Sequence, residues 1–184
     1  MALKMTHGRE VFSCPILSVK EHEVTNSDGL LLNVNTLDLA NWVNVVPVTN
    51  TGEIVLVEQL RFGTNSLVLE TPGGAVEPSE RDLTMAALRE LEEETGLTTQ
   101  RILALPGYYP NPAIQGNLVT FFIAFDVHPV AERANYADPF EEISIQLVTI
   151  DRAYEMVRTG EISHALVCLA LLLAEPHIRR KFGK

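Results

Sequence analysis

The sequence has few of the features that mark secreted or membrane-spanning proteins. Its two cysteines, Cys14 and Cys168, lie far apart in apolar surroundings, so we interpret them as buried free thiols and expect no disulfide framework. The first ten residues are polar, and we expect no signal peptide. The strongly apolar run 165–174 is too short to cross a bilayer. We therefore expect a cytoplasmic protein without a membrane span.

Basic residues are also scarce, with 14 Lys and Arg against 24 Asp and Glu, which gives a net charge of −10. This balance argues against broad binding to nucleic acid or to an anionic membrane. An acidic enzyme that handles phosphates would need metal ions and a few local cations. With 184 residues, 46% of them hydrophobic, the chain suits one domain, or one domain with a small extension.

Strand patterns dominate the chain, and helices are few. Asp28-Gly29 and Asn50-Thr51-Gly52 each separate two apolar runs, so both mark hairpins. The expected strands are 11–24, 30–39, 42–48, 53–60, 67–70, 101–105, 118–127 and 143–150, and the expected helices are 82–95, 151–158 and an apolar helix that begins near 163 and ends before Pro176. Without a repeating strand–helix rhythm, this order predicts the α+β class with a mixed sheet.

The helix expected at residues 82–95 carries an unusual group of acids. Its apolar residues recur at helical spacing, and Gly96 stands where a C-terminal glycine cap belongs. The four acids at its C-terminal end are Glu90, Glu92, Glu93 and Glu94. A helix C-terminus prefers cations, and like charges four residues apart repel, each at a cost of ~0.3–1 kcal/mol.

A metal ion would explain this group of acids. A turn of ~100° per residue places Glu90, Glu93 and Glu94 on one side of the helix, and Glu92 points elsewhere. Three carboxylates on one ridge form an oxygen-rich site for a hard divalent cation such as Mg²⁺. A solvated acidic helix is the alternative interpretation.

The residues around this helix resemble the Nudix hydrolase family. Residues 89–97, RELEEETGL, match the end of the Nudix box, G-x5-E-x7-R-E-U-x-E-E-x-G-U with U apolar. Gly74 and Glu80 keep the family's first spacing. Eight residues then separate Glu80 from Arg89, where the family has seven, so the extra residue is expected in the loop or the first helical turn. The participation of Glu80 is left open by this insertion.

The resemblance implies a Nudix α/β/α sandwich with a mixed sheet over residues 40–184. Residues 1–39 look like the N-terminal antiparallel β-element of the ADP-ribose pyrophosphatase branch, which implies a homodimer. Residues 57–62, VEQLRF, and 69–74, LETPGG, also resemble segments of that branch. Asn111-Pro112-Ala113 departs from the S-P-G-like turn that the branch carries, which leaves a broader nucleotide-sugar specificity open.

By this resemblance, Glu90 and Glu94 are the principal ligands of Mg²⁺, for which Mn²⁺ is a substitute. Glu93 shares the cluster, and the carbonyl of Gly73 completes it. Glu93 and Glu94 thereby become catalytic candidates. Arg89 is interpreted as an ion-pair partner that orients these acids. The histidines His128 and His164 stand without an evident partner, and we interpret them as structural or surface residues.

Other catalytic and substrate-binding candidates lie outside the box. The branch often supplies a general base before a late strand, where Glu141 and Glu142 precede the strand expected at 143–150. Substrate binding is expected from Arg61, Glu70 and Pro112, with Arg61 contacting a diphosphate bidentately.

The resemblance implies Mg²⁺-dependent hydrolysis of the pyrophosphate bond of nucleoside diphosphate sugars such as ADP-ribose, giving a nucleoside monophosphate and a sugar phosphate. One alternative is a nucleoside triphosphate or dinucleoside polyphosphate pyrophosphohydrolase. Another is a non-catalytic Nudix-like nucleotide-binding module. The presence of all three ridge glutamates argues against the last of these.

Overall fold

The computed structural model describes residues 3–131 and 143–183. The chain forms two compact units. One unit combines Met1–Asn41 with Tyr108–Val119, and the other combines Trp42–Gly107 with Thr120–Lys184. In the described part of the chain, no helix is long and apolar enough to cross a membrane.

The first unit is built on a four-stranded antiparallel sheet. Strands β1 (Lys4–Met5) and β2 (Arg9–Cys14) pair with one edge of β3 (Leu17–Thr25), and β4 (Leu31–Asp38) pairs with the other. The hairpin expected around Asp28-Gly29 is confirmed, because Gly29 adopts φ 79° and the Asn26 side chain accepts hydrogen bonds from the N–H groups of Asp28 and Leu30, both at 2.9 Å. The single strand expected at 11–24 is wrong, since a turn at residues 15–16 divides it.

A later segment of the chain completes this unit. The N–H of Leu37 donates to the carbonyl of Ile114 at 2.7 Å, and Leu37 forms an isolated parallel bridge with Gln115. The N–H of Leu118 donates to the Asn41 side chain at 2.8 Å. Residues 108–119 are therefore fastened to the end of β4 and to the residues that follow it.

The second unit contains a seven-stranded sheet. Its strands are β5 (Trp42–Val48), β6 (Glu53–Arg61), β7 (Ser66–Glu70), β8 (Gly73–Ala75), β10 (Arg101–Tyr108), β11 (Val119–Phe125) and β13 (Ile143–Thr149). The order is β10-β11-β5-β6-β13, with β7 paired to β6 and β8 paired to β5. A separate pair joins β9 (Leu97–Thr98) to β12 (His128–Pro129). Apart from its first residue, β5 is buried along its length, as a strand covered on both faces should be.

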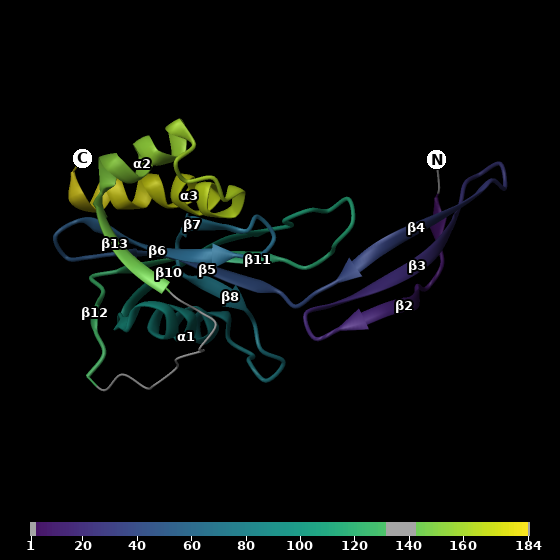
Figure 1. The fold of residues 1–184 in the computed structure, drawn as a ribbon, viewed down its shortest axis with the longest axis horizontal. Helices are drawn as coiled ribbons and strands as arrows, with labels where there is room; N and C mark the ends of the chain where they lie inside the picture. The colour runs from purple at the N-terminus through teal and green to yellow at the C-terminus, as the bar shows by residue number, and fades with distance from the viewer. Residues whose placement is uncertain (1–2, 132–142, 184) are drawn as a thin grey trace. The chain divides into compact units, whose positions relative to one another are not determined.

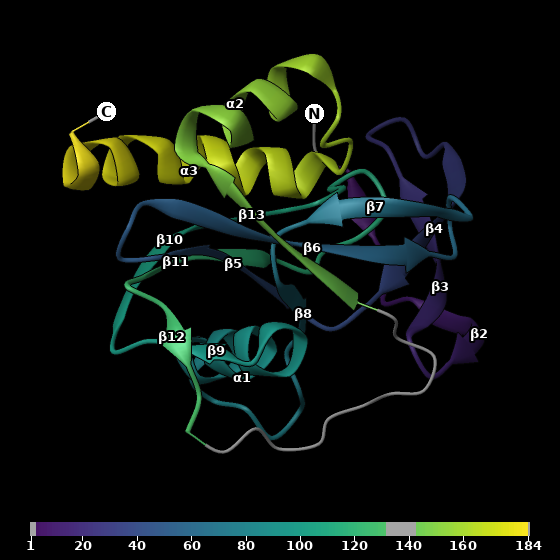
Figure 2. The same cartoon turned by 60° about the vertical axis from the view of Figure 1, so that its left-hand side comes forward.

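Helices cover both faces of this sheet. Helix α1 (Leu83–Thr95) lies on one face, and α2 (Ile150–Thr159) and α3 (Ala165–Phe182) lie on the other (Figures 1 and 2). Helix α1 packs small and apolar side chains into a cluster with residues of β5, β6 and β11, namely Val43, Val45, Val55, Ala86, Ala87, Leu91, Phe122 and Ala124. The site at the end of α1 is thus attached to the centre of the sheet.

The expected end of the apolar helix before Pro176 is wrong, because α3 continues through this proline to Phe182. The last turns are fastened by tertiary contacts. Ile178 is fully buried, Arg179 bonds to Asp151 at 3.1 Å, and Lys181 pairs with Asp126. These contacts offset the hydrogen bond that a proline removes from a helix.

Candidate active site

Two glycines bring the backbone close to both the sheet and α1. In β8, Gly73 and Gly74 pair with Asn44 and Val43 of β5. A Cβ at Gly73 would lie 2.4 Å from the carbonyl oxygen of Val43, and a Cβ at Gly74 would lie 2.6 Å from Oε1 of Glu90. A Cβ at Gly73 would collide with backbone, so glycine is required there, and a Cβ at Gly74 would displace the Glu90 carboxylate.

Helix α1 has local signals at both ends. The Asp82 side chain caps its start by accepting from the N–H of Thr84 at 2.9 Å. Gly96 ends it in the left-handed conformation with φ 69°, and its N–H donates to the carbonyl of Glu92 at 2.8 Å. The predicted helix is confirmed. Its last turn contains no basic residue, so nothing in that turn offsets the helix dipole for the acids there.

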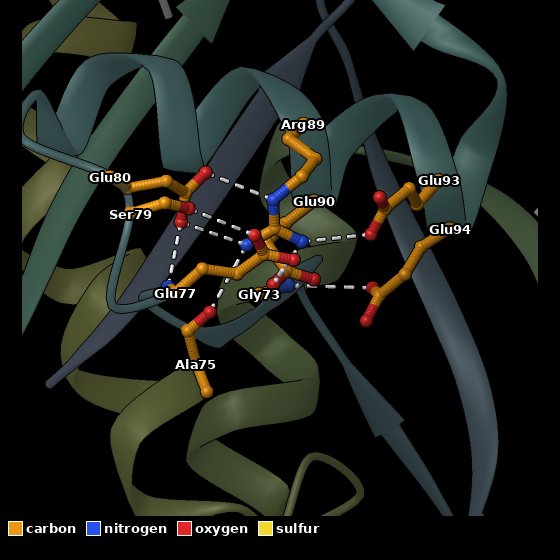
Figure 3. A network of polar contacts seen from close by, with 9 residues as sticks. All are labelled: Gly73, Ala75, Glu77, Ser79, Glu80, Arg89, Glu90, Glu93 and Glu94. Carbon is orange, nitrogen blue, oxygen red and sulfur yellow. Dashed lines mark hydrogen bonds and ion pairs between the residues drawn. The ribbon is translucent and has the colours of Figure 1, made fainter. Parts of the chain in front are cut away.

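Arg89 connects the box acids through its guanidinium (Figure 3). Nε and Nη2 donate to the two carboxylate oxygens of Glu80 at 3.0 and 3.2 Å, and Nη2 also donates to the carbonyl of Ala75 at 3.1 Å. Nη1 lies 2.8 Å from Oε1 of Glu90 and 2.8 Å from Oε2 of Glu93. The predicted ion-pair role of Arg89 is confirmed. One partly buried guanidinium thus serves three carboxylates.

The one-residue insertion leaves Glu80 in contact with the box. In the turn before α1, the N–H of Glu80 donates to the carbonyl of Glu77 at 3.0 Å, and the N–H of Glu77 donates to the Glu80 carboxylate at 2.8 Å. The hydrogen bonds from Arg89 lower the pKa of Glu80, against the desolvation that would raise it. Glu80 therefore remains a charged partner of Arg89.

The three ridge glutamates have different surroundings. Glu90 is buried beneath Gly74, and this burial raises the pKa of its carboxyl group although Arg89 opposes the shift. Glu93 is partly exposed and bonds to Arg89. Glu94 accepts from the N–H of Gly73 at 3.4 Å.

The donor set suits a hard divalent cation in type and charge. It combines three carboxylates with backbone at Gly73, and its most buried member, Glu90, is the one whose charge is most in need of a cation. Among residues 3–131 and 143–183, no three Asp, Glu, His or Cys side chains are gathered closely enough to hold an ion as they stand. Arg89 holds Glu90 and Glu93 in this arrangement, so a metal would compete with its guanidinium for them.

Two of the residues predicted to bind substrate bind each other. Arg61, at the end of β6, donates from Nε to Oε1 of Glu70 at 2.6 Å and from Nη2 to Oε2 at 2.9 Å. Glu70 ends β7, and its side chain is only 4% exposed. A bidentate guanidinium contact fixes the plane of the Arg61 head group.

The structural role expected for His164 is confirmed, but the expectation that it lacks a partner is wrong. It caps α3, where its Nδ1 accepts from the N–H of Leu166 at 3.2 Å, and its Nε2 lies 3.8 Å from Oε2 of Glu70. The two residues are far apart in the sequence, and no motif joins them. Only the capping position before an apolar run offered a signal.

The remaining candidates lie in the other unit or outside the described residues. Pro112 belongs to the other unit, in a turn where the carbonyl of Asn111 accepts from the N–H groups of Ile114 and Gln115 at 3.1 and 3.0 Å. Glu141 and Glu142 lie outside the described residues.

The profile of the NUDIX domain matches residues 39–167, well over half of the chain. The chain belongs to the Nudix family. The Nudix box inferred from residues 74–97 is therefore the box of a true family member, and the predicted family is confirmed.

The chain is similar to proteins with three different names. The chain is 28% identical to an ADP-ribose pyrophosphatase of Bacillus subtilis, over 88% of this chain and 86% of that protein. It is 26% identical to a methanol dehydrogenase activator of Bacillus methanolicus, over 91% and 90%. It is 29% identical to a GDP-mannose pyrophosphatase of Salmonella typhimurium, over 73% of each chain.

A solved structure shows the same fold. The crystal structure of an ADP compounds hydrolase superposes with a TM-score of 0.83 at 17% identity, covering 98% of this chain and 96% of that one. The predicted α+β fold of the Nudix type, with a mixed sheet and few helices, is confirmed.

Proposed function

We propose that this Nudix protein is an enzyme that hydrolyses the pyrophosphate bond of nucleoside diphosphate sugars such as ADP-ribose. The products are a nucleoside monophosphate and a sugar phosphate. The observation that carries this proposal is the complete box: Arg89 bonded to Glu80, Glu90 and Glu93, with Glu94 at the backbone of Gly73. The names of the B. subtilis and Salmonella relatives support the substrate class.

In this proposal Glu90, Glu93 and Glu94 hold Mg²⁺, or Mn²⁺ in its place, together with the carbonyl of Gly73. A bound divalent cation neutralises phosphoryl oxygens and lowers the pKa of a coordinated water. Arg89 keeps the carboxylates in place and compensates their mutual repulsion. Gly74 provides the space for the Glu90 carboxylate.

Substrate recognition is assigned to the Arg61–Glu70 pair. Glu70 holds the guanidinium through Nε and Nη2, and a guanidinium held in one plane suits recognition of a phosphate. Pro112 is proposed to shape the sugar specificity. The general base is proposed to be Glu141 or Glu142, by resemblance to the branch.

The proposal includes a cytoplasmic homodimer whose interface involves the N-terminal element at residues 1–39. The first unit has several exposed large apolar side chains, which support a partner surface there: Leu3, Met5, Val11, Phe12, Ile16, Leu30, Leu31 and Leu32. A second copy of the chain would bury them.

A phosphate-release screen tests the function. Purified protein is given Mg²⁺ and ADP-ribose, GDP-mannose, dGTP or a dinucleoside tetraphosphate, and a coupled phosphatase releases phosphate from the monoester products. For dGTP, released pyrophosphate is detected with pyrophosphatase. Turnover of the nucleotide sugars at least about tenfold above that of dGTP supports the proposal. Preference for dGTP or the dinucleotide supports the polyphosphate alternative, and no turnover of any substrate supports the binding-module alternative.

A further inference from the structure

The carboxylate of Glu70 is a buried charge outside the Nudix box. Its side chain is 4% exposed, and its oxygens accept two hydrogen bonds from Arg61, whose side chain is 41% exposed. A buried carboxylate must be compensated by partners that surround it. Any further partner of the Glu70 carboxylate therefore influences how firmly the pair is held.

His164 is such a partner. Its Nδ1 accepts from the N–H of Leu166, so the proton of the neutral ring lies on Nε2. Nε2 is 3.8 Å from Oε2 of Glu70, the same oxygen that accepts from Nη2 of Arg61. This distance exceeds that of a hydrogen bond, so the neutral ring acts on the carboxylate through the dipole of its Nε2–H group.

The choice of residue at this cap also points to Glu70. Helix caps favour Ser, Thr, Asp and Asn, whose short side chains reach the first turn. A histidine can use one nitrogen as the cap and direct the other away from the helix. At α3 the first nitrogen binds Leu166 and the second faces Glu70, so the ring joins the start of α3 to the end of β7.

We propose that His164 is a positioning residue that acts through Glu70 on Arg61. Its Nε2–H stabilises the Glu70 carboxylate in the orientation that accepts both hydrogen bonds from Arg61. These two bonds fix the plane and the direction of the Arg61 guanidinium. The link to substrate affinity rests on the proposed function, in which Arg61 contacts the diphosphate. The positioning of Arg61 by His164 does not depend on the proposed function, and a separate experiment measures it.

The variant His164→Asn tests the positioning. Asparagine keeps a cap for Leu166 but has no second nitrogen that reaches Glu70. The Nε–H signal of Arg61, identified by its loss in Arg61→Lys, is followed by NMR. Because this N–H is bonded to Glu70, its exchange with water should become about threefold to tenfold faster in His164→Asn. Unchanged exchange would overturn the proposal, whatever the substrate.

Kinetics test the consequence for the substrate. In His164→Asn, the KM for ADP-ribose should rise about threefold to fivefold with kcat unchanged, because a uniform binding contact is weakened. In an Arg61→Ala background the same substitution should leave KM unchanged, since the residue through which it acts is gone. An equal rise in both backgrounds would overturn the proposal.

Thr149→Ala is the matched control, because Thr149 caps α2 through the N–H of Arg152. It should lower the melting temperature and leave KM and the Arg61 exchange unchanged. A wild-type protein that hydrolyses no nucleotide sugar, with faster Arg61 exchange in His164→Asn, would contradict the proposed function and support the positioning.

Discussion

At the residue scale, Arg89 compensates the negative charges of the acids in the box. Four carboxylates near a helix C-terminus repel one another, and one of them, Glu90, is also buried. The guanidinium has five donors in a fixed plane, and it contacts Glu80, Glu90, Glu93 and the carbonyl of Ala75. A lysine would offer a point charge without this geometry, so the site depends on arginine specifically.

The first prediction concerns Glu94, which we propose as a metal ligand. Glu94→Gln should reduce Mg²⁺-dependent hydrolysis of ADP-ribose by at least about 100-fold, because the lost charge weakens metal binding and charge stabilisation. The matched control is Glu92→Gln, which removes a neighbouring charge that is not on the ridge and should retain activity. Activity is measured by phosphate release, and the fold by circular dichroism. A fully active Glu94→Gln would contradict the metal assignment.

The second prediction contrasts two carboxyl groups whose pKa values shift in opposite directions. The pKa of Glu80 is lowered by Arg89, so its charge contributes stability above the ordinary pKa of 4.5 that is lost as pH falls through the shifted value. The pKa of Glu90 is raised by burial, so folding favours its protonated form. The stability that protonated Glu90 contributes is present below pH 4.5 and is lost as the pH rises through the shifted pKa. At pH 7, ionised Glu90 therefore costs stability.

Melting temperatures between pH 4 and pH 8, measured with a chelator, check this contrast. Glu80→Gln should melt lower than wild type at pH 7, and Glu90→Gln should melt higher. Both differences should shrink as the pH approaches 4, where the carboxyl groups become protonated in the unfolded chain. A lower melting temperature for both variants at pH 7 would show that the buried Glu90 is better compensated than its surroundings suggest.

At the scale of elements, α1 is the helix that local sequence determines most fully. Asp82 and Gly96 act on the nearest backbone groups, so their effects are visible in the sequence itself. The end of α3 is different. Pro176 is a local stop signal, yet Asp126 and Asp151 hold the last turns from distant parts of the chain. The local sequence cannot predict where a helix ends when tertiary contacts stabilise the turns beyond a proline.

The contacts of the site also differ in how far apart in the sequence their partners lie. The sequence predicted that Arg89 pairs with the acids of its own helix, because Glu90 and Glu93 lie within one helical turn of it, and left the contact with Glu80 open. The Arg61–Glu70 pair depends on the pairing of β6 with β7, which short-range patterns do not fix in register. The contact of His164 with Glu70 depends on where α3 lies on the sheet. Sequence therefore indicated these residue types without indicating which of them meet.

The third prediction concerns the end of α1. Gly96 has φ 69°, which a residue with a Cβ adopts at a cost of ~1 kcal/mol. Gly96→Ala should lower the free energy of unfolding by about that amount. Gly63→Ala is the control, because a Cβ at Gly63 meets nothing within 4 Å and its φ is not positive. Urea denaturation measures both. Equal stabilities for the two variants would contradict the strained cap.

At the scale of the whole molecule, the first unit is where we expect self-association. Its apolar side chains Phe12 and Ile16 are 57% and 77% exposed. The fourth prediction is that light scattering gives a mass twice the 20.4 kDa of one chain. The double variant Phe12→Lys, Ile16→Lys should have the mass of one chain, because the dimer interface would bury two unpaired lysine charges from each copy. Phe62→Lys, at an equally exposed residue of the other unit, should leave the mass unchanged. A monomeric wild type would contradict the dimer.

The path of the chain through the first unit has a consequence for synthesis. A nascent chain can pair β1 to β4 as soon as they leave the ribosome, but the bonds that Leu37 and Asn41 make with residues 114–118 must wait until the whole box has followed. The N-terminal sheet therefore emerges first and is completed late, and its large apolar side chains are exposed throughout. Chaperone dependence, and sensitivity to the speed of translation between residues 41 and 118, should follow from this order of emergence.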